Sequence, residues 1–165
     1  MVALPVPVET GEREEQMRSY LVVIHPDLDY TPLVEKAQEF VDREPSCFDV
    51  LVPANDSLLH EAFRGDTTDA ELTAARMQLD NAFAALQSTG AQVSGKIVTD
   101  NETAAIGCAL AERDYDEIIL LTTRPLGFER WLNLDEYHRI KHTFNVPITM
   151  IYAHHVKPAP KAASV

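Results

Sequence analysis

Five short apolar runs alternate along the chain with longer stretches of helical spacing, and this alternation limits the fold more than any other feature. Each run has the length of a strand, and continuous apolar runs are typical of strands buried on both faces of a parallel sheet. Parallel strands need a long crossover between them, usually a helix. The predicted strands are 20–24, 48–52, 92–98, 117–122 and 147–152.

The stretches between the runs carry helix signals. Thr31 and Pro32 resemble an N-cap followed by a proline in the first turn, and Pro45 ends the pattern that they start. The predicted helices are 31–44, 69–88, 104–113 and 135–143. The long second helix is predicted to bury one apolar face, made of Leu72, Ala75, Leu79, Ala82, Phe83 and Leu86.

Strands that alternate with helices predict an α/β fold of Rossmann type: a doubly wound, five-stranded, mainly parallel sheet with helices on both faces. Ligands of such sheets bind beyond the carboxyl ends of the strands, where the strand order reverses. We expect one domain over 18–155. Because both ends of the chain mix prolines, charges and small residues without a period, 1–17 is predicted to be a flexible arm and 156–165 a flexible tail.

Composition argues against several classes of protein. A formal charge of −12 repels phosphate backbones and anionic lipids, so neither nucleic acid nor a membrane is an expected partner. No apolar run is long enough to span a bilayer, and the N-terminal segment carries acids where a signal peptide has bases. Cys47 and Cys108 lack paired spacing and are predicted to be reduced thiols, with Cys108 packed inside its helix. We therefore expect a cytoplasmic protein.

Catalytic and cofactor motifs are missing from the sequence. It contains no G-x-S-x-G nucleophile motif and neither of the glycine-rich phosphate-binding motifs. His138 and His142 are one helical turn apart, but no glutamate follows His138 as in the H-E-x-x-H zinc motif. We predict no enzymatic activity, no catalytic residue, no cofactor and no metal site.

Side chains that follow the first, second and fourth runs form the candidate ligand site. A histidine and two aspartates come directly after the first run, and histidine is suited to proton transfer or anion contact near neutral pH. The competing interpretation is a polar turn in which Asp27 and Asp29 cap local backbone groups. The candidate site residues are His25, Pro26, Asp27, Val52, Pro53, Thr122, Thr123, Arg124 and Gly127.

Four segments carry a family resemblance: 20–25, 96–100, 116–124 and 146–152. They are similar to the first, third, fourth and closing strands of the universal stress protein family, and the likeness spans about 19–153. The resemblance implies a non-enzymatic protein of stress response or signalling. It also implies a homodimer that pairs through the last strand, Pro147 to Ala153.

The ATP-binding members of that family have a glycine-rich loop after the fourth strand and an aspartate at the end of the first. In this chain Thr122, Pro125 and Asp135 stand where the glycines would be, and His25 replaces the aspartate. Glycines let backbone amides approach phosphates, whereas the carboxylate of Asp135 would repel them. The resemblance therefore implies a degenerate loop that does not hold ATP in the family's usual way.

One alternative keeps nucleotide binding in altered form, with AMP or a nucleoside as the ligand. Its adenine would lie against Val52 and Pro53. His25, Asp27 and Arg124 would surround the ribose or the phosphate.

A second alternative is a receiver-like signalling domain. Asp100 would then be the phosphorylated aspartate after the third strand, but the lysine required after the last strand is not found before Lys157.

Overall fold

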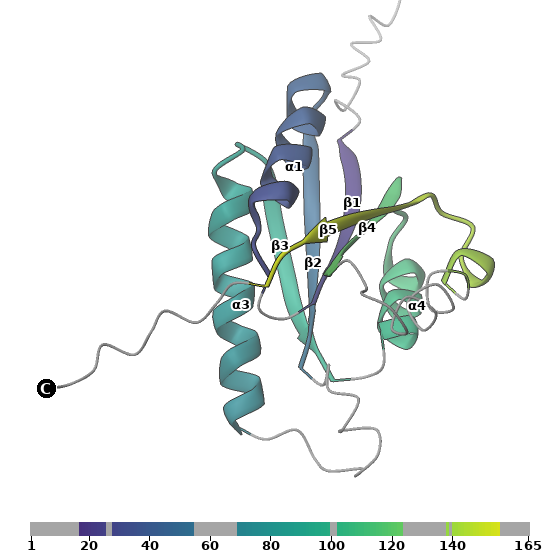
Figure 1. Cartoon of the computed structure of the whole chain (residues 1–165). Coiled ribbons are helices and arrows are strands. Elements are labelled where there is room, and N and C mark those ends of the chain that lie inside the picture. Colours follow the sequence, from purple (N-terminus) through teal and green to yellow (C-terminus); the bar gives the residue numbers. More distant parts are fainter. Residues whose placement is uncertain are drawn as a thin grey trace, which may run out of the picture.

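The computed structural model describes residues 17–25, 28–54, 69–99, 102–123, 138 and 140–155. Its strands form one sheet in the order β3-β2-β1-β4-β5, and every neighbouring pair is parallel (Figure 1). All predicted strands are confirmed, with ends that differ by no more than a few residues. The strands are β1 (Arg18–Ile24), β2 (Ser46–Pro53), β3 (Gln92–Val98), β4 (Glu117–Thr123) and β5 (Ile148–Ala153).

Helices cover both faces of the sheet, as predicted (Figure 1). α1 (Thr31–Arg43) and α3 (Asp69–Gln87) pack on one face, and α4 (Glu102–Glu112) packs on the other together with the helical residues 140–143. The sheet is therefore the middle layer of three, with an apolar core on each side.

The two cores are built from alternate residues of the same strands, because successive side chains of a strand point to opposite faces. Tyr20, Val22 and Ile24 of β1 face α1 and α3, whereas Leu21 and Val23 face α4. These five side chains are all buried. Burial on both faces explains why β1 reads as an uninterrupted apolar run.

Two predictions about helix faces are wrong. Leu72 is 38% exposed rather than buried, although Ala75, Ala82 and Leu86 of the same predicted face are buried. Leu72 lies in the first turn of α3, ahead of the buried positions. Cys108 is exposed rather than packed, because α4 is apolar nearly all round and its sequence does not show which side meets the sheet.

Two helix starts also differ from the sequence prediction. Tyr30 rather than Thr31 is the N-cap of α1, so Thr31 is already helical. α4 begins at Glu102, before the predicted 104. Each difference is the usual uncertainty of one or two residues at a helix end.

The strand order places β1 at the centre, between β2 and β4, and the chain changes direction across the sheet there. Ligands of doubly wound sheets bind at such a switch point. A receiver domain has the order 2-1-3-4-5, so the receiver alternative does not fit this sheet. The predicted arm and tail, Asp100 and Lys157 lie outside the described residues.

No helix among the described residues is long and apolar enough to cross a membrane.

Candidate functional site

Three strands bring part of the predicted site together at the carboxyl end of the sheet, the end where the chain leaves every strand. Ile24 pairs with Leu121 in the sheet, and the backbone N–H of the following His25 donates to the Leu121 carbonyl at 3.1 Å. His25 at the end of β1 therefore lies beside the end of β4, where Thr122 and Thr123 are. This is the switch point of the strand order.

The end of β2 forms the neighbouring part of this surface. Val52 and Pro53 are buried, and they pair with Ile97 and Val98 of β3. Ala54 continues the pairing, since its N–H donates to the Val98 carbonyl at 2.8 Å. This wall is apolar and fixed by the sheet.

Among the described residues at this end, Thr122 is the most buried polar one. It is 7% exposed, and it pairs with Tyr152 of β5 just as Thr123 pairs with Ala153. Neither threonine hydroxyl makes a hydrogen bond to another residue in the described part of the chain. Both hydroxyls thus keep their capacity to bond a ligand.

The structure brings together His25, Val52, Pro53, Thr122 and Thr123. The other predicted site residues, Pro26, Asp27, Arg124 and Gly127, lie outside the described residues, as do the loop positions Pro125 and Asp135.

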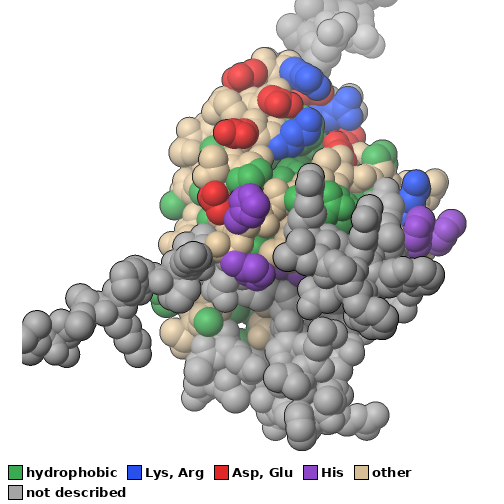
Figure 2. Space-filling view, in the orientation of Figure 1, with side chains coloured by type: hydrophobic (Ala, Val, Ile, Leu, Met, Phe, Trp, Pro, Cys, Tyr) green, Lys and Arg blue, Asp and Glu red, His purple; other side chains and the backbone are tan. Residues whose placement is uncertain are grey.

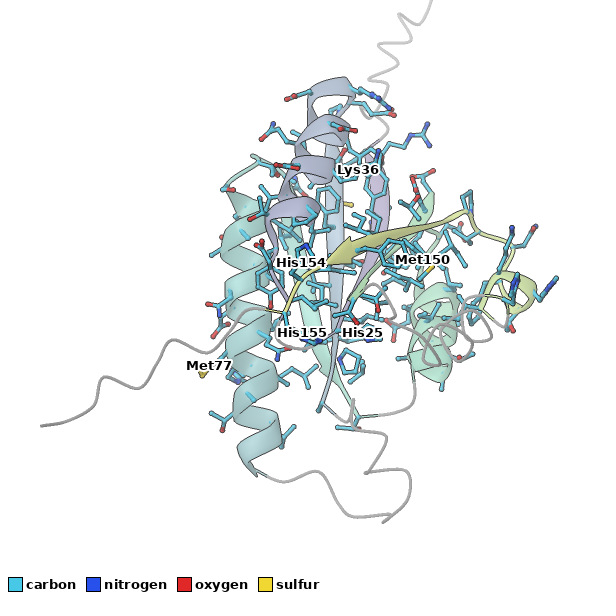
Figure 3. The ribbon with its side chains drawn as sticks, viewed as in Figure 1. His25, Lys36, Met77, Met150, His154 and His155 are labelled. Atoms are coloured by element: carbon cyan, nitrogen blue, oxygen red, sulfur yellow. The ribbon has the colours of Figure 1, made fainter. Side chains whose placement is uncertain are left out.

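Sequence reasoning missed His154 and His155, which follow β5 and reach the same end of the sheet (Figure 3). His155 forms an antiparallel bridge with Leu28, and the backbone N–H of Asp29 donates to the His154 carbonyl at 2.9 Å. The segment after β1 and the segment after β5 are therefore joined. A signal was available, because β5 was predicted to be parallel and must end where β1 ends.

Asp29 caps a local backbone group just before α1, which confirms the competing interpretation for this aspartate, while Tyr30 is the N-cap residue of the helix. Its Oδ1 accepts from the Thr31 backbone N–H at 2.9 Å and from the Thr31 hydroxyl at 2.7 Å. These two hydrogen bonds lower the pKa of Asp29, and the charge of His154 lowers it further. Asp29 is therefore a fixed negative charge beside His154.

Among the described residues, no group of three or more His, Cys, Asp and Glu side chains is arranged to hold a metal ion. His138 and His142 stack with ring centroids 6.3 Å apart and planes 24° apart. They lie away from the carboxyl end of the sheet, on the helical segment before β5.

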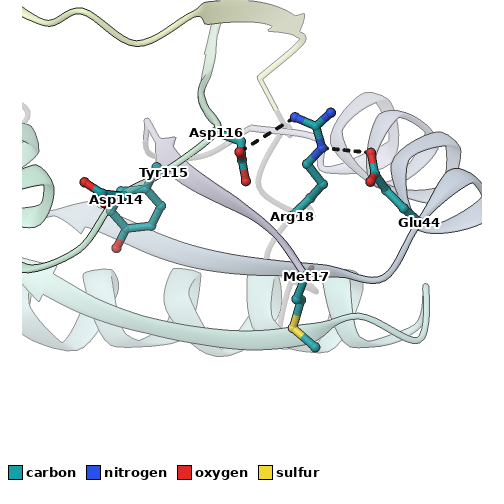
Figure 4. A pocket seen from close by; sticks show the side chains of 6 residues that line it. All are labelled: Met17, Arg18, Glu44, Asp114, Tyr115 and Asp116. Carbon is teal, nitrogen blue, oxygen red and sulfur yellow. Dashed lines mark hydrogen bonds and ion pairs between the residues drawn. The ribbon is translucent and has the colours of Figure 1, made fainter. Parts of the chain in front are cut away.

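A polar pocket of about 510 Å³ lies at the opposite, amino end of the sheet (Figure 4). Arg18 crosses it, with Nε 2.8 Å from Glu44 Oε1 and Nη1 3.7 Å from Asp116 Oδ1. The ion pairs tie the start of β1 to the end of α1 and to the start of β4. The pocket is lined by Met17, Arg18, Glu44, Asp114, Tyr115 and Asp116.

Beside this pocket, a set of side chains that we call the Asp49 network joins β2 to the chain between α4 and β4. The carboxylate of Asp49 accepts from the Tyr115 hydroxyl at 2.6 Å, from Arg113 Nη1 at 3.1 Å and from the Ser94 hydroxyl. Arg113 Nη2 also donates to the Ser19 hydroxyl at 3.0 Å. Each group is satisfied by another protein group, so the Asp49 network is a structural feature.

The Asp49 network shifts the pKa values of its members. Burial acts to raise the pKa of Asp49, but hydrogen bonds from Ser94 and Tyr115 and the charge of Arg113 outweigh it and hold it below its ordinary value. Burial, and then the hydrogen bond to Asp49, raise the pKa of the Tyr115 phenol well above its ordinary value. Asp49 is thus ionised and Tyr115 neutral at neutral pH.

No family model matches the sequence, and no curated protein matches it either. Solved structures do match. A universal stress protein from Archaeoglobus fulgidus aligns with a TM-score of 0.57 at 15% identity, over 84% of this chain and 98% of that one. The Archaeoglobus fulgidus universal stress protein in complex with dAMP gives 0.56 at 16% identity, over 82% and 97%.

A universal stress protein in complex with cAMP aligns with a TM-score of 0.53 at 12% identity, over 82% of this chain and 98% of that one. At these identities the likeness is one of fold. The resemblance seen in the sequence is confirmed at that level: the chain has the fold of universal stress proteins.

Proposed function

We propose that this chain is a non-enzymatic universal-stress-type protein that acts as a homodimer in stress response or signalling and does not hold ATP through a glycine-rich loop. The observation that supports it best is the likeness of fold to solved universal stress proteins over 84% of the chain. The proposal that the loop does not hold ATP is supported by the replacement of the loop glycines and of the aspartate at the end of the first strand.

The difference between the two edge strands supports the homodimer. β3 carries Gly95 and Lys96, and glycine and lysine are residues that discourage pairing with another chain. β5 carries no charged residue, its large apolar side chains are only half-buried, and Tyr152 is 42% exposed. An uncharged apolar edge strand is suited to pairing with a second copy.

Light scattering after size-exclusion chromatography tests the dimer and its interface. The unaltered chain should elute as a dimer, and Tyr152→Glu on β5 should shift it to monomer by placing two carboxylates in one interface. The matched control is Met77→Glu on α3, which also puts a charge at an exposed apolar residue and should stay dimeric. A monomeric unaltered chain, or a dimer broken only by Met77→Glu, would contradict the proposal.

A phosphate-release assay tests the non-enzymatic part. The described carboxyl end offers one carboxylate, Asp29, and two hydrogen bonds from Thr31 already engage it. We expect no release from ATP above the buffer rate, with or without magnesium. Sustained turnover that follows the protein through purification would overturn this part.

The second candidate function is binding of AMP or a nucleoside, and the hydroxyl of Thr122, which has no described hydrogen-bond partner, favours it. Thr122 follows Leu121, to which the backbone of His25 is bonded. Two neighbours in fold were solved with dAMP and cAMP.

Thermal-shift measurements with adenosine, AMP and ATP test this candidate. A ligand at a hundred times its Kd stabilises a protein by about 2.7 kcal/mol, which is readily measured. We expect stabilisation by AMP and adenosine and none by ATP. Absence of a shift with all three would refute nucleotide binding, and a shift with ATP alone would refute the degenerate loop.

A further inference from the structure

We propose that His25, His154 and His155 form an anion-binding subsite at the carboxyl end of the sheet, which takes the phosphate of a nucleotide with a single negative charge when the imidazoles are protonated. The inference rests on the second candidate function, nucleotide binding. It assigns a role to two histidines that the candidate site did not include.

The placement of the three histidines is the first support. His25 is held at the end of β1 by its backbone bond to Leu121, beside Thr122. The bridge between Leu28 and His155 brings the segment after β5 to within three residues of His25 along the chain. Figure 2 shows histidine side chains near the middle of the visible face, with an acidic side chain beside the upper one and most lysine and arginine side chains above them; other histidines lie at the right edge.

The shortage of other cations at this end is the second support. The last two residues of β2, β3 and β4 carry no titratable group, and no lysine or arginine is described at the carboxyl ends of the strands. On α1, α3 and the carboxyl ends of β1 and β5, the charged and titratable side chains that the structure describes are Asp29, Tyr30, Glu35, Lys36, Glu39, Asp42, Arg43, Arg76, Asp80 and Tyr152. Of these, Lys36 pairs with Glu39 at 3.1 Å and Tyr30 donates to the Gln78 carbonyl at 3.3 Å.

Protonation reverses the sign of the charge at this end. With neutral imidazoles, the charge that the structure shows acting on one of these histidines is the carboxylate of Asp29, which interacts with His154 and is kept ionised by its hydrogen bonds from Thr31. With protonated imidazoles the histidines outnumber that carboxylate, and the local charge becomes positive. Histidine makes this change between about pH 5 and 8. An anion is therefore repelled at the upper end of that range and attracted at the lower end.

The decisive experiment compares cAMP with adenosine by titration calorimetry at low salt, at about pH 5.5 and about pH 8. cAMP is suitable because its phosphodiester keeps one negative charge over this range, whereas the phosphate of AMP titrates near pH 6. We expect cAMP to bind about tenfold more tightly at the lower pH, as charge contacts at a partly exposed site allow. Adenosine, which is neutral, should bind equally at both.

Variants assign the effect to the histidines. The double variant His154→Gln with His155→Gln should lose most of the pH dependence, while His155→Lys should bind cAMP tightly at both pH values. His142→Gln removes an exposed histidine outside the subsite and should behave like the unaltered protein. Both His154 and His155 are exposed, so these changes leave the cores intact.

The outcomes separate this inference from the candidate function on which it rests. Equal cAMP affinity at both pH values, or a pH dependence that survives in the double variant, would overturn the subsite while adenosine binding still supports a nucleotide site. If neither cAMP nor adenosine binds at either pH, nucleotide binding fails and the subsite fails with it.

Discussion

The two ends of the sheet use polar residues in opposite ways. At the amino end Arg18 pairs with Glu44 and Asp116, and in the Asp49 network the Tyr115 hydroxyl and both terminal nitrogens of Arg113 donate to protein acceptors. At the carboxyl end the hydroxyls of Thr122 and Thr123 bond to no described residue. Polar groups that bond one another stabilise a fold, whereas those left available can serve a ligand. Substitutions at the amino end should therefore lower stability, and those at the carboxyl end should lower binding.

The largest effect on stability is expected from Asp49→Ala. The substitution removes the acceptor of Tyr115 and Arg113, and the side chain of Asp49 is 17% exposed, so the loss should be about 2 kcal/mol of unfolding free energy. Urea unfolding measures it. Asp114→Ala removes the same charge at an exposed residue and should be neutral. Equal stability of the two variants would contradict the structural role of the Asp49 network.

Tyr115→Phe should cost less, about 1 kcal/mol, because it removes one hydrogen bond and leaves Asp49 with its bonds from Arg113 and Ser94. The same unfolding measurement applies. Ligand binding should be unchanged, since Tyr115 lies at the other end of the sheet. A variant that binds less but unfolds normally would reverse the assignment of the two ends.

The pH dependence of stability tests the same network. The pKa of Asp49 is lowered in the folded chain, so its contribution is present above about pH 4 and is lost as pH falls through the folded value. The pKa of Tyr115 is raised, so its contribution is present below about pH 10 and is lost as pH rises through the folded value. Asp49→Asn should flatten the acid limb of the unfolding curve, and Tyr115→Phe the alkaline limb. If the two variants show the same acid and alkaline limbs as the unaltered protein, other titratable groups determine the pH dependence of stability.

The smallest effect on stability is expected at the carboxyl end, from Thr122→Val, which replaces the hydroxyl by a methyl group of similar size. The hydroxyl makes no hydrogen bond to a described residue, so the unfolding free energy should change by no more than about 0.5 kcal/mol. Loss of one hydrogen bond to a bound nucleoside should weaken binding about fivefold. A large loss of stability with unaltered binding would remove the contrast between the ends.

The fold was predictable because a continuous apolar run indicates a strand that is buried on both faces of a sheet. Each of the strands β1 to β5 coincides with one of the apolar runs. The sequence does not show which side of a uniformly apolar helix packs against the sheet. For that reason Cys108 was predicted to be packed although it is exposed. The Asp49 network had one visible signal, an aspartate inside the apolar run 48–52. Its partners are brought close only by the folded chain, with Arg113 and Tyr115 more than sixty residues away.

The part of the candidate site that depends on sheet topology was predictable from the sequence. His25, Val52 and Thr122 meet because parallel strands end together, and the same rule applies to His154 after β5. The bridge from Leu28 to His155 was not predictable, since a single antiparallel contact leaves no pattern in the sequence.

The Asp49 network also limits how this sequence can diverge. A chain that lost the aspartate would leave a phenol and a guanidinium without their acceptor, and one that lost Arg113 would leave the carboxylate without its countercharge. Single changes at these positions are unfavourable while joint replacement by apolar side chains can be neutral. Descendants of this chain should therefore keep or lose Asp49, Arg113 and Tyr115 together. In an alignment of related sequences, these three positions should covary.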